Sequence, residues 1–269
     1  MDWLEVSRGE APLVVSFPHT GTDIPRDIEA RLASPWLARK DADWWVDRLY
    51  AFAAELGPTL VRTTMSRTVI DVNRDPTGAS LYPGQTTTEL CPTTTFDGER
   101  LYKAGQEPGA AEIAARRARW FDPYHATLQA ELERLRARHG KVVLYEAHAI
   151  RSRVPRLFDG ELAQFNIGSN SGASCDRALV RAVEKACDAA GSRVTDGRFK
   201  GGWTTRRYGR PKEGVHAIQM ELACRGYMDE PAGPPSPDSW PTAFDPAAAE
   251  PMRRALADVL NAALAFARA

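Results

Sequence analysis

The sequence predicts an α/β protein whose largely parallel or mixed sheet is covered by helices on both faces. Short apolar, β-branched runs alternate along the chain with segments that repeat apolar residues at helical spacing, and this alternation is typical of strands joined by covering helices. The composition is that of an ordinary globular protein, with 43% hydrophobic and 26% charged residues among 269. Neither an internal repeat nor a shift in composition divides the chain, which predicts a single domain over residues 1–269.

The first half of the chain is predicted to contribute three strands and one helix. Residues 13–17 form an apolar run that a proline ends, which is typical of a buried strand. Apolar side chains at helical spacing predict a helix over 43–56, and the Gly-Pro pair that follows ends it. Residues 59–63 and 68–72 are interpreted as two more strands. Residues 75–98 are longer than the about 12–15 residues of an ordinary connection, which favours a functional loop.

The second half of the chain is predicted to alternate in the same way. Residues 110–138 have a charged helical pattern, and Pro123 marks a break or the start of a second helix. The other predicted elements are, in order, a strand over 141–145, an amphipathic helix over 174–190, a strand over 216–222, a proline-rich surface loop over 231–246 and a helix over 246–267.

The charge balance and the cysteines argue against several classes of protein. The 35 basic and 35 acidic side chains cancel, so no net field favours nucleic acid or a membrane surface. Four cysteines without CxxC spacing are interpreted as the reduced thiols of a cytosolic protein. The acidic N-terminus lacks the apolar segment of a signal peptide, and no stretch reaches the about 18 apolar residues of a membrane span. We therefore expect a soluble cytoplasmic protein.

Two histidines lie next to the ends of predicted strands. His19 follows the strand over 13–17, and His148 follows the strand over 141–145. The carboxyl ends of strands meet at one edge of an open α/β sheet, and two imidazoles with one carboxylate suit a catalytic zinc. The sequence has no compact HExxH signature that would by itself indicate a metal site. The alternative is therefore that each histidine caps its strand or makes a structural hydrogen bond. The candidate carboxylates are Asp23, Asp41, Asp43, Asp47 and Glu146.

Asn73 and Arg74 end the predicted strand over 68–72. A guanidinium group matches a carboxylate bidentately, and an amide adds a donor beside it, so this pair suits a substrate carboxylate. The alternative is a buried ion pair of Arg74 with a neighbouring aspartate. Residues 197–209 place several cations between glycines, which suits either an anion site or a basic surface hairpin.

Glu221 is a carboxylate in the otherwise apolar strand predicted over 216–222. It shares one face of that strand with Gln219. A carboxylate that points into a site can act as a general base toward a metal-bound water, whereas a solvated face of an edge strand is the structural alternative. We expect a structural role for His125 and an exposed helix end for His139, and we assign no role to His216.

Ordered motifs extend over residues 13–230 of the chain. They are SFPHTG at 16–21, DADWWV at 41–46, SR at 66–67, DVNR at 71–74, LYPGQ at 81–85, PYH at 123–125, HAIRS at 148–152, PRLF at 155–158, GRFKGG at 197–202, QMEL at 219–222 and YM at 227–228. Together they resemble the N-formylglutamate deformylase, or N-formylglutamate amidohydrolase, family. The resemblance implies a three-layer α/β/α fold with a mixed, mostly parallel sheet, similar to zinc carboxypeptidases and aspartoacylase. It also implies hydrolysis of N-formyl-L-glutamate to formate and L-glutamate, in histidine degradation.

The resemblance implies a divalent metal, zinc in the first place, and its ligands. These are His19, His148 and a carboxylate of the 41–43 segment, for which Asp43 is favoured over Asp41.

The resemblance also implies the residues that act on the substrate. Glu221 matches the general base, and Arg67 matches the arginine that polarises the scissile carbonyl. Asn73 and Arg74 match the pair that grips a substrate carboxylate, and we expect Arg206 to help hold the second carboxylate.

Two segments depart from the family pattern. The chain has EAHA at 146–149 where the family usually has Asp-Ala-His-Ser, and it has LAQFN at 162–166 where the family tends toward Leu-Pro-Asp-Leu-Asn. These departures motivate a second hypothesis, a metal-dependent amidase for another N-acyl acidic amino acid of the N-acylaspartate or succinylglutamate type. A third is a non-catalytic protein that binds an acidic amino acid, although binding alone would require neither the two histidines nor Glu221.

Overall fold

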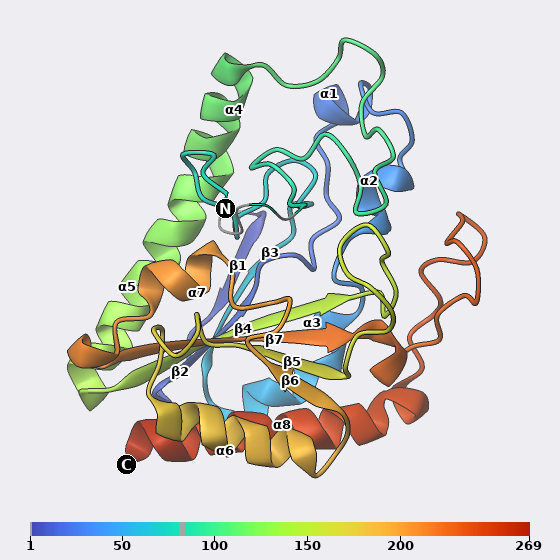
Figure 1. The fold of residues 1–269 in the computed structure, drawn as a ribbon. Coiled ribbons are helices and arrows are strands. Elements are labelled where there is room, and N and C mark those ends of the chain that lie inside the picture. Colours follow the sequence, from blue (N-terminus) through green and yellow to red (C-terminus); the bar gives the residue numbers. More distant parts are fainter. Residues whose placement is uncertain (1, 81–83, 85) are drawn as a thin grey trace.

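A computed structural model describes residues 2–80, 84 and 86–269, and a seven-stranded mixed sheet forms its centre (Figure 1). The strands lie in the order β1-β3-β2-β4-β7-β5-β6. Their bounds are Leu4–Ser7 for β1, Leu13–Phe17 for β2, Thr59–Thr63 for β3, Val142–Ile150 for β4, Phe165–Gly168 for β5, Arg193–Thr195 for β6 and Val215–Ala223 for β7.

The sheet is mostly parallel, as predicted. Strands β3, β2, β4 and β7 run parallel to one another, and β6 runs parallel to β5. Strand β1 pairs antiparallel with β3, and β5 pairs antiparallel with β7. Every residue of β2, β4 and β7 is buried, so the carboxyl ends of these central strands lie inside the molecule.

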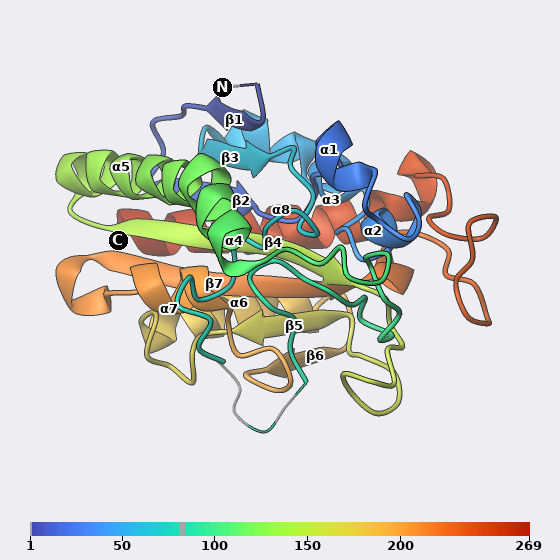
Figure 2. The ribbon, with the colours of Figure 1, turned by 90° about the horizontal axis from the view of Figure 1, so that it is seen from above.

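Helices cover both faces of the sheet, which gives the three-layer α/β/α arrangement (Figure 1). One face packs against α6 (Arg177–Asp188) and α8 (Pro246–Arg268), together with α3 (Val46–Leu49). The other face packs mainly against α5 (Asp122–His139). Figure 2 views the molecule from the side of α4 and α5, with α8 behind the strands. The shorter helical segments are α1 (Arg26–Glu29), α2 (Leu37–Lys40), η1 (Ala51–Leu56), α4 (Ala110–Arg116), η2 (Arg117–Phe121), α7 (Trp203–Tyr208), η3 (Pro211–Glu213) and η4 (Cys224–Gly226).

The covering of both faces explains why the central strands are apolar throughout. In β2, Leu13 and Val15 pack toward α6 and α8, whereas Val14 packs toward α5, because successive side chains of a strand point to opposite faces. The predicted helices over 174–190 and 246–267 are confirmed as α6 and α8. Asp176 and Asp245 cap their N-termini by accepting backbone N–H bonds.

The predicted strand over 68–72 is wrong. These residues form successive turns, and two side chains stabilise the turns locally: Ser66 Oγ accepts the N–H of Thr68 at 3.2 Å, and Asp71 Oδ1 accepts the N–H of Asn73 at 2.9 Å. The apolar side chains that suggested a strand are buried in the core on the α5 side. Burial, rather than pairing in a sheet, therefore explains the apolar run.

The predicted helix over 43–56 begins too early and is not one helix. Trp45 has a left-handed backbone with φ of 65°, so helix α3 begins only at Val46 and gives way to the 3₁₀ helix η1. The break expected near Pro123 is a π-helical turn, η2, which ends before the proline. Pro123 lies in the first turn of α5, where its missing N–H is harmless.

The strand predicted over 141–145 extends to Ile150, so His148 lies within β4 rather than after it. The strand predicted over 216–222 is one residue longer at each end, as β7. Strands β1, β5 and β6 and helix α7 were not predicted, because each is six residues or shorter and lacks a repeated apolar pattern. No helix in the part of the chain that the structure describes is long and apolar enough to cross a bilayer.

Candidate metal centre

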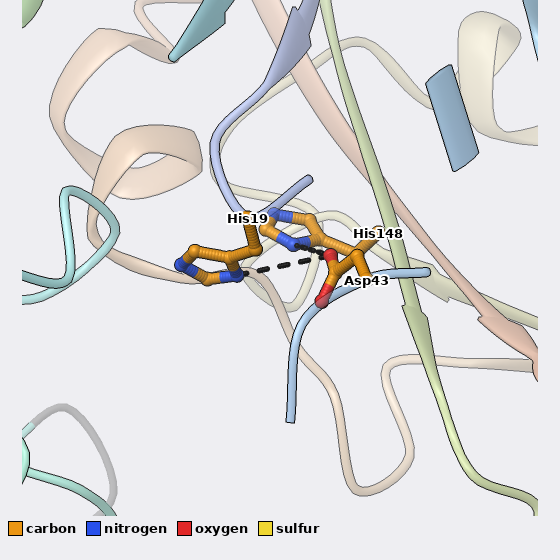
Figure 3. A group of neighbouring side chains, drawn as sticks. All are labelled: His19, Asp43 and His148. Atoms are coloured by element: carbon orange, nitrogen blue, oxygen red, sulfur yellow. Dashed lines mark hydrogen bonds and ion pairs between the residues drawn. The ribbon is translucent and has the colours of Figure 1, made fainter. Parts of the chain in front are cut away.

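Three of the predicted site residues meet at the carboxyl ends of the central strands. His19 follows β2, His148 lies near the end of β4, and Asp43 lies in the loop before α3. One ligand atom from each lies within 4.8 Å of the others, and Figure 3 shows the three side chains converging. All three are buried, with relative exposures of 1–3%. The group can hold a metal ion.

Both imidazoles turn the same ring nitrogen toward Asp43. The distance from His148 Nδ1 to Asp43 Oδ2 is 3.1 Å, and that from His19 Nδ1 to the same oxygen is 3.8 Å (Figure 3). The centroids of the two rings are 4.8 Å apart. Asp43 Oδ1 is buried and has no hydrogen-bond partner. A buried carboxylate oxygen beside two converging nitrogens fits the donor set of a zinc or similar divalent ion.

The backbone around Asp43 explains how this carboxylate reaches the histidines. Its N–H donates to the carbonyl of His19 at 2.9 Å, which ties the two loops together. The N–H of Ala149 donates to Asp43 Oδ2 at 3.2 Å. The left-handed backbone of Trp45 then turns the chain into α3. These contacts hold the carboxylate at the end of β4.

Asp71 orients His19 from the side away from Asp43. The distance from His19 Nε2 to Asp71 Oδ1 is 2.7 Å, so a proton on Nε2 leaves the lone pair of Nδ1 facing the centre. Burial, reinforced by the charge of Arg67, lowers the pKa of His19 to about 4 against the opposing effect of Asp71. His19 is therefore neutral at pH 7, as a metal ligand must be. From the sequence, Asp71 is predicted only as a candidate ion-pair partner of Arg74, although it begins the DVNR motif.

His148 lies among carboxylates. Burial disfavours its charged form, but the hydrogen bond to Asp43 and the nearby carboxylate of Glu146 outweigh burial and raise the pKa of His148 to about 10. A metal ion would have to displace the proton that Nδ1 shares with Asp43.

Glu221 lies opposite His148 on the neighbouring strand. The two residues are Cα partners in the β4–β7 ladder, and Gln219 Nε2 donates to Glu221 Oε2 at 3.2 Å. Strand β7 lies between β4 and β5, so the edge-strand alternative for Glu221 is wrong. Burial, with the negative charge of Asp43, raises the pKa of Glu221 to about 7 against the opposing charge of His148. A carboxyl group that titrates near neutrality suits a general base.

A cavity beside the three metal-site residues brings most of the other predicted residues together. Its lining includes Arg67, Asn73, Arg74 and Glu221 as well as His19 and His148. Arg67 is buried; its Nη2 donates to Asp71 Oδ2 at 2.7 Å, and its Nη1 lies 3.8 Å from Asp43 Oδ1. A guanidinium group is therefore fixed at the rim of the candidate metal centre.

Asn73 and Arg74 also face the cavity, each from a turn that neighbouring groups hold. Asn73 Oδ1 accepts the N–H of Thr204 at 3.0 Å, and its Nδ2 lies 3.1 Å from His148 Nε2. Arg74 donates to the carbonyl and hydroxyl of Thr88. Its Nε also lies 3.7 Å from Asp71 Oδ2, so the ion pair considered as an alternative is present as well.

Two of the three arginines of the 197–209 segment, Arg198 and Arg206, differ in position. Arg198 lines the cavity and donates to the carbonyls of Leu157 and Thr86. Arg206, on α7, is not among the described residues that line it, and its Nε donates to the carbonyl of Gly201. The role expected for Arg206 stays a prediction.

The other candidate carboxylates lie outside the group of three. Asp41 accepts the N–H of Phe96 and pairs with Arg151, and Asp47 pairs with Arg62. Glu146 is buried 3.8 Å from the outer nitrogen of His148. Most of the LYPGQ motif at 81–85 lies outside the described residues.

Comparison with known proteins identifies the family. The family model described as N-formylglutamate amidohydrolase matches residues 11–228. The chain belongs to the N-formylglutamate amidohydrolase family. It is 45% identical over 267 residues to an N-formylglutamate deformylase of Pseudomonas aeruginosa, which covers 98% of this chain and 97% of that protein. It is 40% identical over 265 residues to an N-formylglutamate deformylase of Pseudomonas putida, with 98% and 96% covered.

Two crystal structures share the fold of this family member. An N-formylglutamate amidohydrolase from Ralstonia eutropha superposes with a TM-score of 0.78 at 24% identity, over 99% of this chain and 98% of that one. A gene product from Agrobacterium tumefaciens superposes with a TM-score of 0.69 at 17% identity, over 98% and 95%. At these identities the likeness concerns the fold alone, and it agrees with the three-layer arrangement predicted from the sequence.

Proposed function

We propose that this chain is a metal-dependent amidohydrolase that cleaves N-formyl-L-glutamate to formate and L-glutamate. The observation that carries the proposal is the convergence of His19 Nδ1 and His148 Nδ1 on Asp43, beside a cavity that Glu221 and arginines line. The names of relatives at 45% and 40% identity support the choice of substrate. As the resemblance implies, we assign the reaction to histidine degradation in the cytoplasm.

His19, Asp43 and His148 are the proposed ligands of the metal, with zinc as the first candidate. When bound, such an ion lowers the pKa of a water molecule toward about 7 and polarises a carbonyl oxygen. Asp71 holds His19 in the tautomer that presents Nδ1 to the ion.

Glu221 is the proposed general base and acid. It takes a proton from the attacking water as the new C–O bond forms at the formyl carbon. It then gives that proton to the amide nitrogen as the C–N bond breaks, so formate and the free amino group of glutamate leave. Its raised pKa suits both transfers, since a group that titrates near 7 can accept and release a proton at neutral pH.

The arginines divide between the reacting group and the substrate carboxylates. Arg67, fixed by Asp71, is placed to stabilise the negative charge that develops on the formyl oxygen. Asn73 and Arg74 are the proposed anchors of one glutamate carboxylate. For the second we propose Arg198, which lines the cavity, alongside the Arg206 role predicted from the sequence.

Formate release from N-formyl-L-glutamate tests this function directly. The purified protein is assayed as prepared, after treatment with a chelator, and after zinc is added back. We expect release that the chelator abolishes and zinc restores. A folded, zinc-loaded protein that releases no formate would contradict the proposal. A panel of N-acylaspartates and succinylglutamate, compared by kcat/KM, would then test the related amidase activity, and binding without turnover would indicate an acidic amino-acid-binding protein.

A further inference from the structure

Glu146 is a carboxylate buried without a hydrogen-bond partner. It lies on β4 two residues before His148, its relative exposure is 0%, and neither of its oxygens has a partner. The neighbouring hydroxyl groups of Ser16 and Tyr124 bond to each other at 2.6 Å. Burying a carboxylate without a hydrogen-bond partner is costly. We therefore expect a functional form of the protein to supply a hydrogen-bond donor to Glu146.

The nearest candidate donor is the outer nitrogen of His148. Glu146 Oε2 lies 3.8 Å from His148 Nε2, which a displacement of about 1 Å or less would shorten to a hydrogen bond. Figure 3 shows that the Nδ1 side of this ring faces Asp43. When Nδ1 binds a metal ion, the neutral ring carries its proton on Nε2 and must donate that proton to an acceptor.

Asn73 cannot be that acceptor, although its amide lies closer. Its Oδ1 accepts the N–H of Thr204 at 3.0 Å, which fixes the orientation of the amide and leaves Nδ2 facing His148 Nε2 at 3.1 Å. An amide nitrogen is only a donor, so it serves Nε2 only while that nitrogen lacks a proton. A protonated Nε2 therefore faces another donor at Asn73 and an acceptor at Glu146.

We propose that Glu146 is the positioning residue for His148, accepting the Nε2 proton whenever Nδ1 binds the metal. The proposal rests on the metal site of the proposed function and extends it. It gives His148 the same kind of outer carboxylate that Asp71 provides for His19. It also gives Asn73 two states, because a ring that donates to Glu146 releases the Nδ2 group. That group is then available to a substrate carboxylate in the cavity that Asn73 lines.

Glu146→Met tests the proposal, because methionine has a similar length and no acceptor. Zinc affinity is measured by competition with a chromophoric chelator, and the melting temperature Tm is measured on chelator-treated protein. Glu131→Met is the matched control. Glu131 is equally buried, but its carboxylate pairs with Arg8 at 2.6 Å and with Arg134 at 2.9 Å on the α5 side.

We expect the two variants to differ in both measurements. Glu146→Met should bind zinc about 10–100-fold more weakly, the usual effect of losing an outer partner of a ligating histidine. Its Tm without metal should fall less than that of Glu131→Met, since Glu146 makes no hydrogen bond in the metal-free protein. Glu131→Met should keep the zinc affinity of the wild type and lose Tm, since it leaves buried ion-pair partners behind.

Unchanged zinc affinity in Glu146→Met, or equal losses in both variants, would overturn the proposal. If Glu146→Met does not fold, Glu146→Gln is measured instead. Glutamine keeps a neutral acceptor, so we expect its zinc binding to be about 3-fold or more weaker than that of the wild type. Wild-type zinc affinity in Glu146→Gln would overturn the positioning role. A wild-type protein that binds no zinc contradicts the proposed metal site itself, whereas variants that bind as tightly as a zinc-binding wild type contradict only this inference.

Discussion

Replacing Glu221 with glutamine is expected to make the protein slower and more stable. Glutamine has the same shape as glutamate and can keep a hydrogen bond with Gln219, whose Nε2 lies 3.2 Å from Glu221 Oε2. It cannot accept the proton of the attacking water, so kcat should fall about 10²–10⁴-fold, which is about 3–5 kcal/mol in the activation barrier. Zinc should stay bound, because Glu221 is not one of the three residues that converge on the metal position.

The gain in stability follows from the pKa of Glu221. Burial raises this pKa from 4.5 to about 7. The unfolded chain releases its proton near 4.5 and the folded protein holds it to about 7, so the wild type loses stability as the pH rises between these values. The full difference is about 3 kcal/mol above pH 7, at 1.36 kcal/mol for each pKa unit. Glutamine does not titrate, so Tm of the metal-free variant should exceed that of the wild type by roughly 6–12 °C.

Two measurements check this reasoning together. Formate release from N-formyl-L-glutamate gives kcat, and thermal unfolding of chelator-treated protein at pH 5 and pH 8 gives Tm. The control is Glu131→Gln, which neutralises a buried, ion-paired glutamate on α5 and should lower Tm without lowering kcat. Near-wild-type turnover in Glu221→Gln would refute the general-base role. A gain in Tm that does not grow from pH 5 to pH 8 would refute the argument from burial.

Three further outcomes are expected. Asp71→Asn should weaken zinc binding about 10–100-fold in a chelator competition, because His19 loses the carboxylate that orients it at 2.7 Å; unchanged affinity would contradict that role. Arg198→Met should raise KM for N-formyl-L-glutamate about 10–100-fold in steady-state kinetics, because one charged hydrogen-bonding group is lost. Arg206→Met should raise KM less, because Arg206 does not line the cavity. A larger effect of Arg206→Met would indicate that Arg206, rather than Arg198, binds the second carboxylate. Burial lowers the pKa of His125 to about 3, so between pH 6.5 and 5 the unfolded chain binds a proton at this residue and the folded protein does not. The free energy of unfolding, measured with urea, should therefore fall by about 2 kcal/mol over this range. His125→Gln should lack that part of the pH dependence.

The layers of the fold were predictable because burial on both faces makes strands apolar throughout. Strand β2 follows from such a pattern, and helices α6 and α8 follow from apolar residues at helical spacing. The apolar run over 68–72 predicts a strand where the chain forms turns, since a buried turn and a buried strand carry similar side chains. Strands as short as β6 have too few residues to show a period.

The candidate site was predictable from residue types and resemblance, but its internal geometry was not. His19 directly after an apolar strand was a readable signal. The choice of Asp43 came only from the resemblance, because the left-handed backbone of Trp45 that helps to place it leaves no mark in the pattern. Asp71 lies 2.7 Å from His19, and Glu146 lies 3.8 Å from His148, and only the tertiary structure provides these distances.

The buried charges around His19 and His148 also imply that the net charge of the site differs between the metal-free and the metal-bound protein. The two arginines nearest the centre, Arg67 and Arg74, both approach Asp71. Four buried carboxyl groups, those of Asp43, Asp71, Glu146 and Glu221, lie near the two histidines, and the charged form of His148 offsets part of their negative charge. A divalent cation bound at the proposed site would take the place of the His148 proton and add further positive charge to this enclosure. We therefore expect the cation to favour entry of a substrate that itself carries two carboxylates, in addition to its part in cleavage.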